Sequence, residues 1–283
     1  MRLKLTLLLI VLTTTVWAQK RKAPSSYKDP FLATQWYLGF FAGGNLSKAT
    51  PSAAYYGYEP LNYDARVIGK TYTGLKKLGT QAGLVFMFYT KGFTIGLKPG
   101  IHTYEVEHIT NANWSDSNDP NNTLEISYTH TTNFNYLELP LTVQYDLMKG
   151  RIRPYIGVGG YYGLLLNANR TVQRSGTDAA SGSSGSFVNT ATTIGVSDLF
   201  IKSALGINGF VGVSYDPGNI RITMDVGYKL GLNNITSTEN RYLNNELSAI
   251  GEATDDLSLQ NLYLNFGFVF PLKFISKNFD AIN

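Results

Sequence analysis

The chain has 283 residues, a formal net charge of +4 and no cysteine. This length suits one large domain or two small ones, and the lack of cysteine excludes disulfides, thiolate metal sites and a lipid-anchoring cysteine. Without Arg2 and Lys4, which precede an apolar N-terminal run, 22 basic residues remain against 20 acidic ones (+2), too mild a charge to indicate a nucleic-acid partner.

The N-terminus has the pattern of a secretory signal peptide. Residues 5–16 are apolar or threonine, and Val16, Trp17 and Ala18 fit a signal-peptidase site. The apolar run is shorter than the ~20 residues that a membrane-spanning helix needs. We therefore expect a signal peptide over 1–18, a periplasmic arm over 19–34, a β-barrel over 35–272 and a periplasmic tail over 273–283.

Eight segments alternate apolar and polar residues with the period of two that is typical of strands. In the last segment, Leu262, Leu264 and Phe266 share a wholly apolar face, while the other face is small, polar or mixed. The expected strands are residues 36–46, 79–89, 93–106, 134–147, 152–166, 198–215, 220–232 and 259–270.

The connections between these segments alternate in length. Short turns lie at 91–92, 148–151 and 216–219, and the other connections are long; those over 111–122 and 167–197 are expected to be irregular loops from their Asn, Ser, Thr and Gly content. Outer-membrane barrels combine long extracellular loops, short periplasmic turns and an even number of strands. The sequence therefore predicts an all-β fold, an eight-stranded antiparallel up-and-down transmembrane barrel in the cell outer membrane.

The two faces of the strands favour a membrane barrel over a soluble barrel of lipocalin type. A soluble barrel would carry Lys and Glu on its outer face, whereas the polar face here is mostly Gly, Thr, Asn and Tyr, which suits a narrow interior. Aromatic residues lie outward near the short-turn ends of six strands, as in a periplasmic girdle: Trp36, Phe88, Phe93, Tyr145, Tyr215 and Phe270. Pro140 lies within a strand and predicts a bulge, because proline removes a ladder donor.

Inward-facing charges form the candidate site. They are Lys98, Glu138, Asp146, Arg153, Arg221, Asp225 and Lys229. Counting from the periplasmic strand ends matches Glu138 with Lys229 and Lys98 with Asp225 in height, and the other three lie next to the turns. Because an unpaired charge is costly in a filled interior, we expect layers of opposite charges with a structural role. A proton relay or a ligand site is the alternative.

Three histidines are present. His102 points inward, while His108 and His130 fall near the loop ends of their strands, where an outer-membrane hydrolase would place its catalytic groups. No serine or aspartate spacing marks a nucleophile, so we expect these two to be solvated loop residues, with no enzymatic activity, cofactor or metal. The tyrosines of the first long connection either bind a partner or glycan or pack over the barrel mouth.

The hairpin of the fourth and fifth strands carries a family resemblance. Its sequence, Asn-Tyr-Leu-Glu-Leu-Pro-Leu over 135–141 and Arg-Pro-Tyr-Ile-Gly-Val-Gly-Gly over 153–160, resembles the PorT-like outer-membrane β-barrel family of the Bacteroidota. The likeness extends in pattern over residues 36–270. It implies an outer-membrane barrel, and some members are associated with type IX secretion and gliding, which would make components of that machinery partners.

The sequence thus predicts a non-catalytic outer-membrane barrel, surrounded by lipid, with a structural, secretion-associated or surface-binding role. A small-solute porin is the first alternative and an outer-membrane enzyme the second. Bulky side chains at inward positions, Tyr136, Tyr155, Tyr161, Phe200 and Phe210, argue against a wide pore, because eight strands leave an interior just large enough for side chains.

Overall fold

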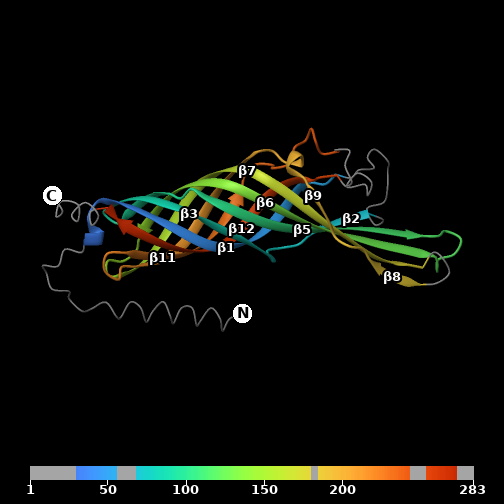
Figure 1. Ribbon diagram of the computed structural model, residues 1–283, viewed down its shortest axis with the longest axis horizontal. Helices are drawn as coiled ribbons and strands as arrows, with labels where there is room; N and C mark the ends of the chain where they lie inside the picture. The colour runs from blue at the N-terminus through green and yellow to red at the C-terminus, as the bar shows by residue number, and fades with distance from the viewer. Residues whose placement is uncertain (1–29, 56–67, 180–183, 243–252, 273–283) are drawn as a thin grey trace. The chain divides into compact units, whose positions relative to one another are not determined.

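The computed structural model describes residues 30–55, 68–179, 184–242 and 253–272 (Figure 1). The chain divides into two units, Met1–Ala33 and Thr34–Asn283. The described part of the first unit holds a short 3-10 helix, η1 (Pro30–Leu32). The expected signal peptide, most of the arm and the tail over 273–283 lie outside the described residues. No helix in the described ranges is long and apolar enough to cross a membrane.

The second unit is an antiparallel sheet. Its described strands are β1 (Gln35–Ala53), β2 (Ile68–Tyr72), β3 (Lys77–Thr90), β4 (Phe93–Leu97), β5 (Gly100–Ser115), β6 (Thr123–Asp146), β7 (Ile152–Asp178), β8 (Gly185–Val188), β9 (Thr192–Gly195), β10 (Ser203–Tyr215), β11 (Arg221–Gly231) and β12 (Asp256–Pro271), with a 3-10 turn, η2 (Ser197–Leu199), before β10.

The sheet closes on itself. β1 pairs with β3 on one side and with β12 on the other, and the ring runs onward from β3 through β4 and β5, β6, β7, β10 and β11 to β12. β4 and β5 share one position, because Leu97 pairs with Leu141 and Gly100 with Glu138 in one unbroken register. The ring therefore has eight strand positions, and the predicted eight-stranded fold is confirmed.

The bulge that we expected at Pro140 is not there. Pro140 pairs with Tyr161 in regular register, and the shift between β6 and β7 lies at Asn135/Tyr136 instead. The Lys98 N–H donates to the Pro140 carbonyl at 3.1 Å, and Pro140 has no N–H to donate in return. The ladder therefore loses one hydrogen bond at Lys98 and Pro99, between β4 and β5, without inserting a residue.

Two segments expected to be loops are largely strand. β5 continues to Ser115, and β7 continues to Asp178, where it pairs with β8 and β9. β6 and β7 have 24 and 27 residues, whereas a membrane-crossing strand needs about 9–11. They therefore extend past the membrane on the side opposite the short turns, with β8 alongside in Figure 1. The expected sixth strand begins later, since β10 starts at Ser203 after η2.

The strand faces divide as the alternation requires. Outward side chains of the transmembrane part are apolar and exposed, and the aromatic ones near the short turns pack in pairs across strands, Trp36 on Phe88 and Phe93 on Tyr145, with ring centroids 5.0 and 4.8 Å apart. The inward aromatic residues are buried: Tyr136, Tyr155, Tyr161, Phe200 and Phe210. Phe200 lies in the segment after η2 rather than on a strand.

Inward aromatic rings lie on glycines of neighbouring strands. A Cβ added at Gly212 would lie 2.4 Å from the Tyr155 ring and 2.6 Å from the Met224 carbonyl oxygen, and one at Gly227 would lie 2.4 Å from the Tyr263 ring. These glycines make room for the rings that fill the interior. Gly209, three residues before Gly212 on β10, has open space where its Cβ would be.

These contacts give a matched pair of substitutions. Gly212→Ala should destabilise the barrel by about 1–3 kcal/mol, because Tyr155 and the β11 backbone cannot both move aside. Gly209→Ala should change stability by less than about 0.5 kcal/mol. Urea unfolding of the refolded protein in detergent measures both values. Equal effects of the two changes would contradict the ring-on-glycine packing.

Candidate functional site

The charges nearest the short turns form one cluster. Asp216 accepts hydrogen bonds from two arginines, from Arg221 Nε at 2.9 Å to its Oδ1 and from an Nη of Arg153 to its Oδ2. The Arg221 guanidinium also lies over the ring of Tyr37, 4.9 Å from its centroid. Asp146 is buried close by, yet neither of its oxygens has a hydrogen-bond partner in the described structure. Asp216 thus takes the arginine contacts that we expected at Asp146.

Sequence reasoning missed Asp216 because it reads as the first residue of an Asp-Pro-Gly turn. A signal was available, since the inward positions of β10 continue from Phe210 through Gly212 and Ser214 to Asp216. The strand alternation therefore places the carboxylate at the periplasmic end of the interior, where it is 6% exposed.

The next level holds Lys98 and Asp225. Lys98 Nζ lies 3.6 Å from Asp225 Oδ2. The same oxygen accepts a hydrogen bond from the Tyr155 hydroxyl at 3.4 Å, and Oδ1 accepts one from Asn265 Nδ2 at 3.3 Å. The Lys98 ammonium lies 5.4 Å from the centroid of the Phe210 ring. The structure therefore surrounds this pair with aromatic rings and amides.

A second ion pair lies further from the turns. Lys229 Nζ is 2.5 Å from Glu138 Oε2, and both side chains are almost fully buried. Glu138 Oε1 accepts a hydrogen bond from the Tyr104 hydroxyl, and Lys229 donates to the same hydroxyl at 3.0 Å. The ammonium also lies between 5.3 and 5.7 Å from the ring centroids of Tyr104, Tyr161 and Tyr263. Tyrosines thus replace the water that both charges lose on burial.

Beyond this pair lies a layer of mainly apolar side chains. Phe134, Leu199, Phe200 and Ile235 belong to one buried cluster on the extracellular side of Glu138 and Lys229. Phe134 and Phe200 meet edge to face with centroids 4.7 Å apart. The segment after η2 is held there by the Ile201 N–H, which donates to the Ile235 carbonyl at 2.8 Å. The barrel interior is therefore charged on the periplasmic side, and above the ion pairs these apolar side chains pack with the buried Arg170, whose guanidinium lies 6.0 Å from the centroid of the Phe200 ring.

His108 and His130 are not solvated. Both are buried, and their rings stack with centroids 4.4 Å apart at 4°. The expectation of solvated loop residues was wrong because β5 and β6 continue as paired strands past these positions. The neighbouring Glu107 does not contact the histidine pair but forms an ion pair with Lys77 at 2.8 Å. Lys77 lies beyond the membrane-crossing part of β3, and its hydrogen bond to Glu107 raises the pKa of Lys77. The described residues contain no group of three His, Asp or Glu side chains that could hold a metal ion.

The first and last long connections are tied together over the barrel mouth. Asp255 accepts hydrogen bonds from Tyr72 at 2.7 Å, from the Tyr55 N–H at 2.8 Å and from Lys70 at 3.1 Å. The Arg241 guanidinium lies 3.2 Å from the centroid of the Tyr55 ring. These two tyrosines therefore pack against the mouth of the barrel; the remaining tyrosines of that connection up to residue 63 lie outside the described residues.

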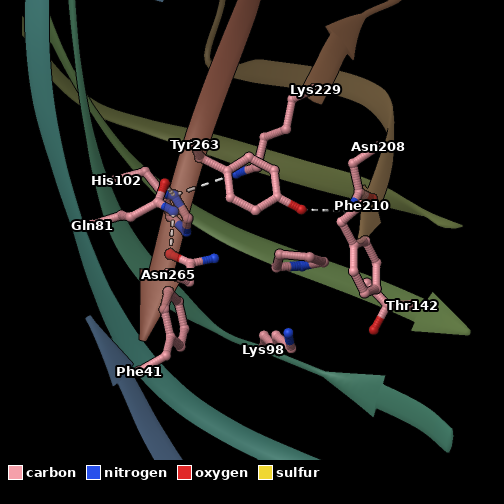
Figure 2. Close-up of a pocket in the computed structure, with 11 residues that line it drawn as sticks. Phe41, Gln81, Lys98, His102, Thr142, Asn208, Phe210, Lys229, Tyr263 and Asn265 are labelled. Atoms are coloured by element: carbon pink, nitrogen blue, oxygen red, sulfur yellow. Dashed lines mark hydrogen bonds between the residues drawn. The ribbon is translucent and has the colours of Figure 1, made fainter. Parts of the chain in front are cut away.

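A small cavity lies between the two ion-pair levels (Figure 2). Measured as the space open to the centre of a water molecule, its volume is about 20 Å³. This is room for one or two water molecules. Lys98 of one ion pair and Lys229 of the other line the cavity, together with polar side chains that include His102 and Asn208. His102, which was expected to point inward, does so and is 2% exposed.

The sequence matches the model of the outer membrane protein beta-barrel domain over residues 17–237, most of the chain. The chain belongs to this family. The barrel is therefore embedded in the outer membrane, and lipid surrounds its apolar outer face.

Solved structures with a similar fold share little sequence. The outer membrane protein OprG from Pseudomonas aeruginosa has 15% identity and a TM-score of 0.34, with 86% of this chain and 99% of that chain covered. Neisserial surface protein A has 10% identity and a TM-score of 0.31, with 82% and 95% covered. The attachment invasion locus protein of Yersinia pestis, in complex with sucrose octasulfate, has 10% identity and a TM-score of 0.28, with 83% and 99% covered. No curated protein matches the sequence.

The Glu138–Lys229 pair gives a double-mutant cycle. Glu138→Gln or Lys229→Met alone should cost about 3–5 kcal/mol, because each leaves a buried charge without its partner. The double variant should cost less than the sum of the two. Urea unfolding in detergent measures all four proteins.

The half-exposed pair of Lys77 and Glu107 is the matched control. Their side chains are 32% and 18% exposed, so Glu107→Gln should cost no more than about 1 kcal/mol. If the effects of Glu138→Gln and Lys229→Met simply add, the buried pair is not energetically coupled and the interior is wetter than its geometry indicates.

Proposed function

We propose that the protein is a non-catalytic surface-binding barrel: its interior anchors and seals it, and its extracellular sheet meets a partner. The observation that carries the proposal is the length of β6 and β7, 24 and 27 residues, more than twice the ~9–11 residues that a crossing needs. An extended paired sheet outside the membrane has no role in spanning the bilayer. It presents a fixed surface to the outside of the cell.

The interior supports this reading over the porin alternative. The interior is filled in layers along the barrel. From the periplasmic side these are the Arg–Asp cluster, the two buried ion pairs and the apolar cluster around Phe134 and Phe200. The cavity between the ion-pair levels has room for only one or two water molecules. A small-solute path would have to break several of these contacts at once.

The distal part of the sheet offers the binding surface. A shallow groove of about 330 Å³ runs across β5, β6 and β7 and is lined mainly by Asn111, Asn113, Glu125, Ser127 and Thr177. These are amides, hydroxyls and one carboxylate, and four of the five side chains are exposed. The surface therefore suits a polar partner that is recognised by hydrogen bonds.

The hairpin resemblance favours one class of partner. Residues 135–141 and 153–160 are similar to the PorT-like family of the Bacteroidota, some of whose members are associated with type IX secretion and gliding. In this second and more specific proposal, the partner is a component of secretion or gliding machinery, and the binding surface includes the periplasmic side of the barrel.

The sealed interior predicts the absence of a stable pore. In planar bilayers the refolded protein should show no large, stable single-channel conductance, because the ion pairs and the apolar cluster block the path. A sixteen-stranded porin in the same lipid serves as the positive control. Steady openings of the wild-type protein would favour the porin alternative over a binding role.

The binding surface can be tested by site-specific photo-cross-linking in native outer membrane. A photoreactive phenylalanine analogue at Asn113 or Thr177 should give discrete adducts, because both positions line the extracellular groove. The same analogue at lipid-facing Leu139 should give none. A protein adduct at Lys149, in a periplasmic turn, would favour the secretion-associated role; no adduct at Asn113 or Thr177 would contradict the surface-binding role.

A further inference from the structure

The outward face of β6 and β7 changes from apolar to polar where the membrane crossing ends. On β6 the outward side chains are apolar over residues 137–145, a span that matches the ~9–11 residues of a crossing. Beyond it the outward positions of both strands carry only amides and hydroxyls, all exposed or half-exposed. These residues form the amide face: Thr129, Thr131, Asn133 and Asn135 on β6, and Asn167, Asn169, Thr171 and Gln173 on β7.

A β-bulge places the asparagines of β7 on this face. Asn135 pairs with Asn167 and Tyr136 pairs with Leu165, so Leu166 is an extra residue in β7. Leu166 and Asn167 are both exposed in consequence. From Asn167 onward, each side chain of β7 therefore lies on the opposite face from the one that uninterrupted alternation would give it.

The bulge also keeps positive charge away from the amide face. Uninterrupted alternation would turn Arg170 and Arg174 outward. Both arginines instead lie on the inner face, where their guanidinium groups are 6.0 and 4.9 Å from the ring centroids of Phe200 and Phe187. The amide face is consequently uncharged.

The side chains of the amide face form rows across the strands. Thr103 of β5 donates from its hydroxyl to Asn135 Oδ1 at 2.8 Å, and Asn135 Nδ2 donates to Asn167 Oδ1 at 2.6 Å. In the next row Asn133 lies directly opposite Asn169, at the ~5 Å separation of cross-strand neighbours. Successive rows on one face follow each other every ~6.6 Å along the strands. The paired strands therefore present amide groups at a fixed spacing.

The composition of the amide face favours a neutral ligand that is rich in hydroxyl groups. Asn and Gln side chains offer both donors and an acceptor, and the Thr hydroxyl does both as well. Sugar hydroxyls, which also donate and accept, match this set. An anionic group is disfavoured, because Glu105 and Glu107 border the face on β5, where Lys77 forms ion pairs with them at 3.9 and 2.8 Å.

The position of the amide face identifies the source of such a ligand. The face continues the lipid-facing surface without a break, since Asn135 follows Leu137 at the next outward position of β6. The molecules beside it are therefore the head groups of the outer leaflet. We propose that the amide face binds the sugar portion of an outer-leaflet glycolipid, whose acyl chains lie against the apolar belt below. This site is nearer the membrane than the groove at Asn113 and Thr177, and it does not depend on a partner there.

The test is native mass spectrometry of the refolded protein in detergent. The protein is titrated with a lipooligosaccharide, or with the lipid A that mild acid releases from it, so that the acyl chains are the same and only the sugars differ. The wild-type protein should retain the lipooligosaccharide about tenfold more tightly or better, because several amide hydrogen bonds are lost with the sugars. Equal retention of the two lipids would overturn the proposal.

Two pairs of substitutions locate the site. Asn133→Ala with Asn169→Ala should abolish most of the preference for the lipooligosaccharide. Asn111→Ala with Asn113→Ala removes the same groups from the distal groove, at least ~20 Å further along the strands, and should leave the preference intact. A preference that survives the first pair, or is lost with the second, would contradict the assignment to the amide face.

Salt distinguishes the sugars from the phosphates of the same lipid. Because the amide face is uncharged, the preference should persist when ammonium acetate is raised from about 0.1 to about 0.5 M, whereas recognition of phosphates would be screened. Loss of the preference at the higher concentration would overturn the choice of a neutral ligand. The wild-type comparison of the two lipids decides the proposal even where a variant does not refold.

Discussion

The pairing of the first strand with the last is the contact on which the rest of the structure depends. Lipid offers no partner to a backbone N–H or C=O, so a sheet in the membrane must close. Here β1 and β12 pair from Tyr37 opposite Pro271 to Ala53 opposite Asp256. Closing the sheet with eight strand positions makes the interior narrow, and that width determines what can lie inside.

A narrow interior explains why the inward face mixes glycine, aromatic rings and charges. Rings such as Tyr155 and Tyr263 fill the space, and they fit only where the facing residues are Gly212 and Gly227. Little room is left for water, so a charge in this space must find its counter-charge and hydrogen bonds within the protein. The tyrosine hydroxyls that bond Glu138 and Asp225 belong to the same rings that do the filling. The same tyrosines therefore both fill the interior and provide hydrogen bonds to its buried carboxylates.

Much of this was accessible from the sequence, because alternation with a period of two is a direct consequence of lying between lipid and a filled lumen. The same reasoning failed where lipid no longer acts. Beyond the membrane both faces of a strand can be polar, so β5, β6 and β7 continue through Asn-, Ser- and Thr-rich segments that composition identifies as loops. His108 and His130 were misplaced with them. Asp216 was missed because a turn signal hid its place in the β10 alternation. The bulge predicted at Pro140 was wrong because the strands keep their register there and give up one hydrogen bond.

For the inward charges, too, the sequence predicted some features correctly and missed others. Height along a strand can be counted, and the counting that matched Glu138 with Lys229 and Lys98 with Asp225 agrees with the contacts in the structure. Partners that lie on a turn, or amides that donate to a buried carboxylate, leave no periodic signal. The sequence therefore indicates which charges face inward better than it indicates what each one touches.

The order of these layers bears on where any activity can reside. The apolar cluster around Phe134 and Phe200 separates the charged interior from the extracellular side, and the contacts of Asp255 with Tyr55, Lys70 and Tyr72 tie the long connections over it. A partner arriving from outside meets the mouth and the sheet of β5, β6 and β7 before any buried charge. In the proposed surface-binding role, recognition uses the polar side chains of that sheet. The interior contributes by holding the strands that carry the sheet in one register.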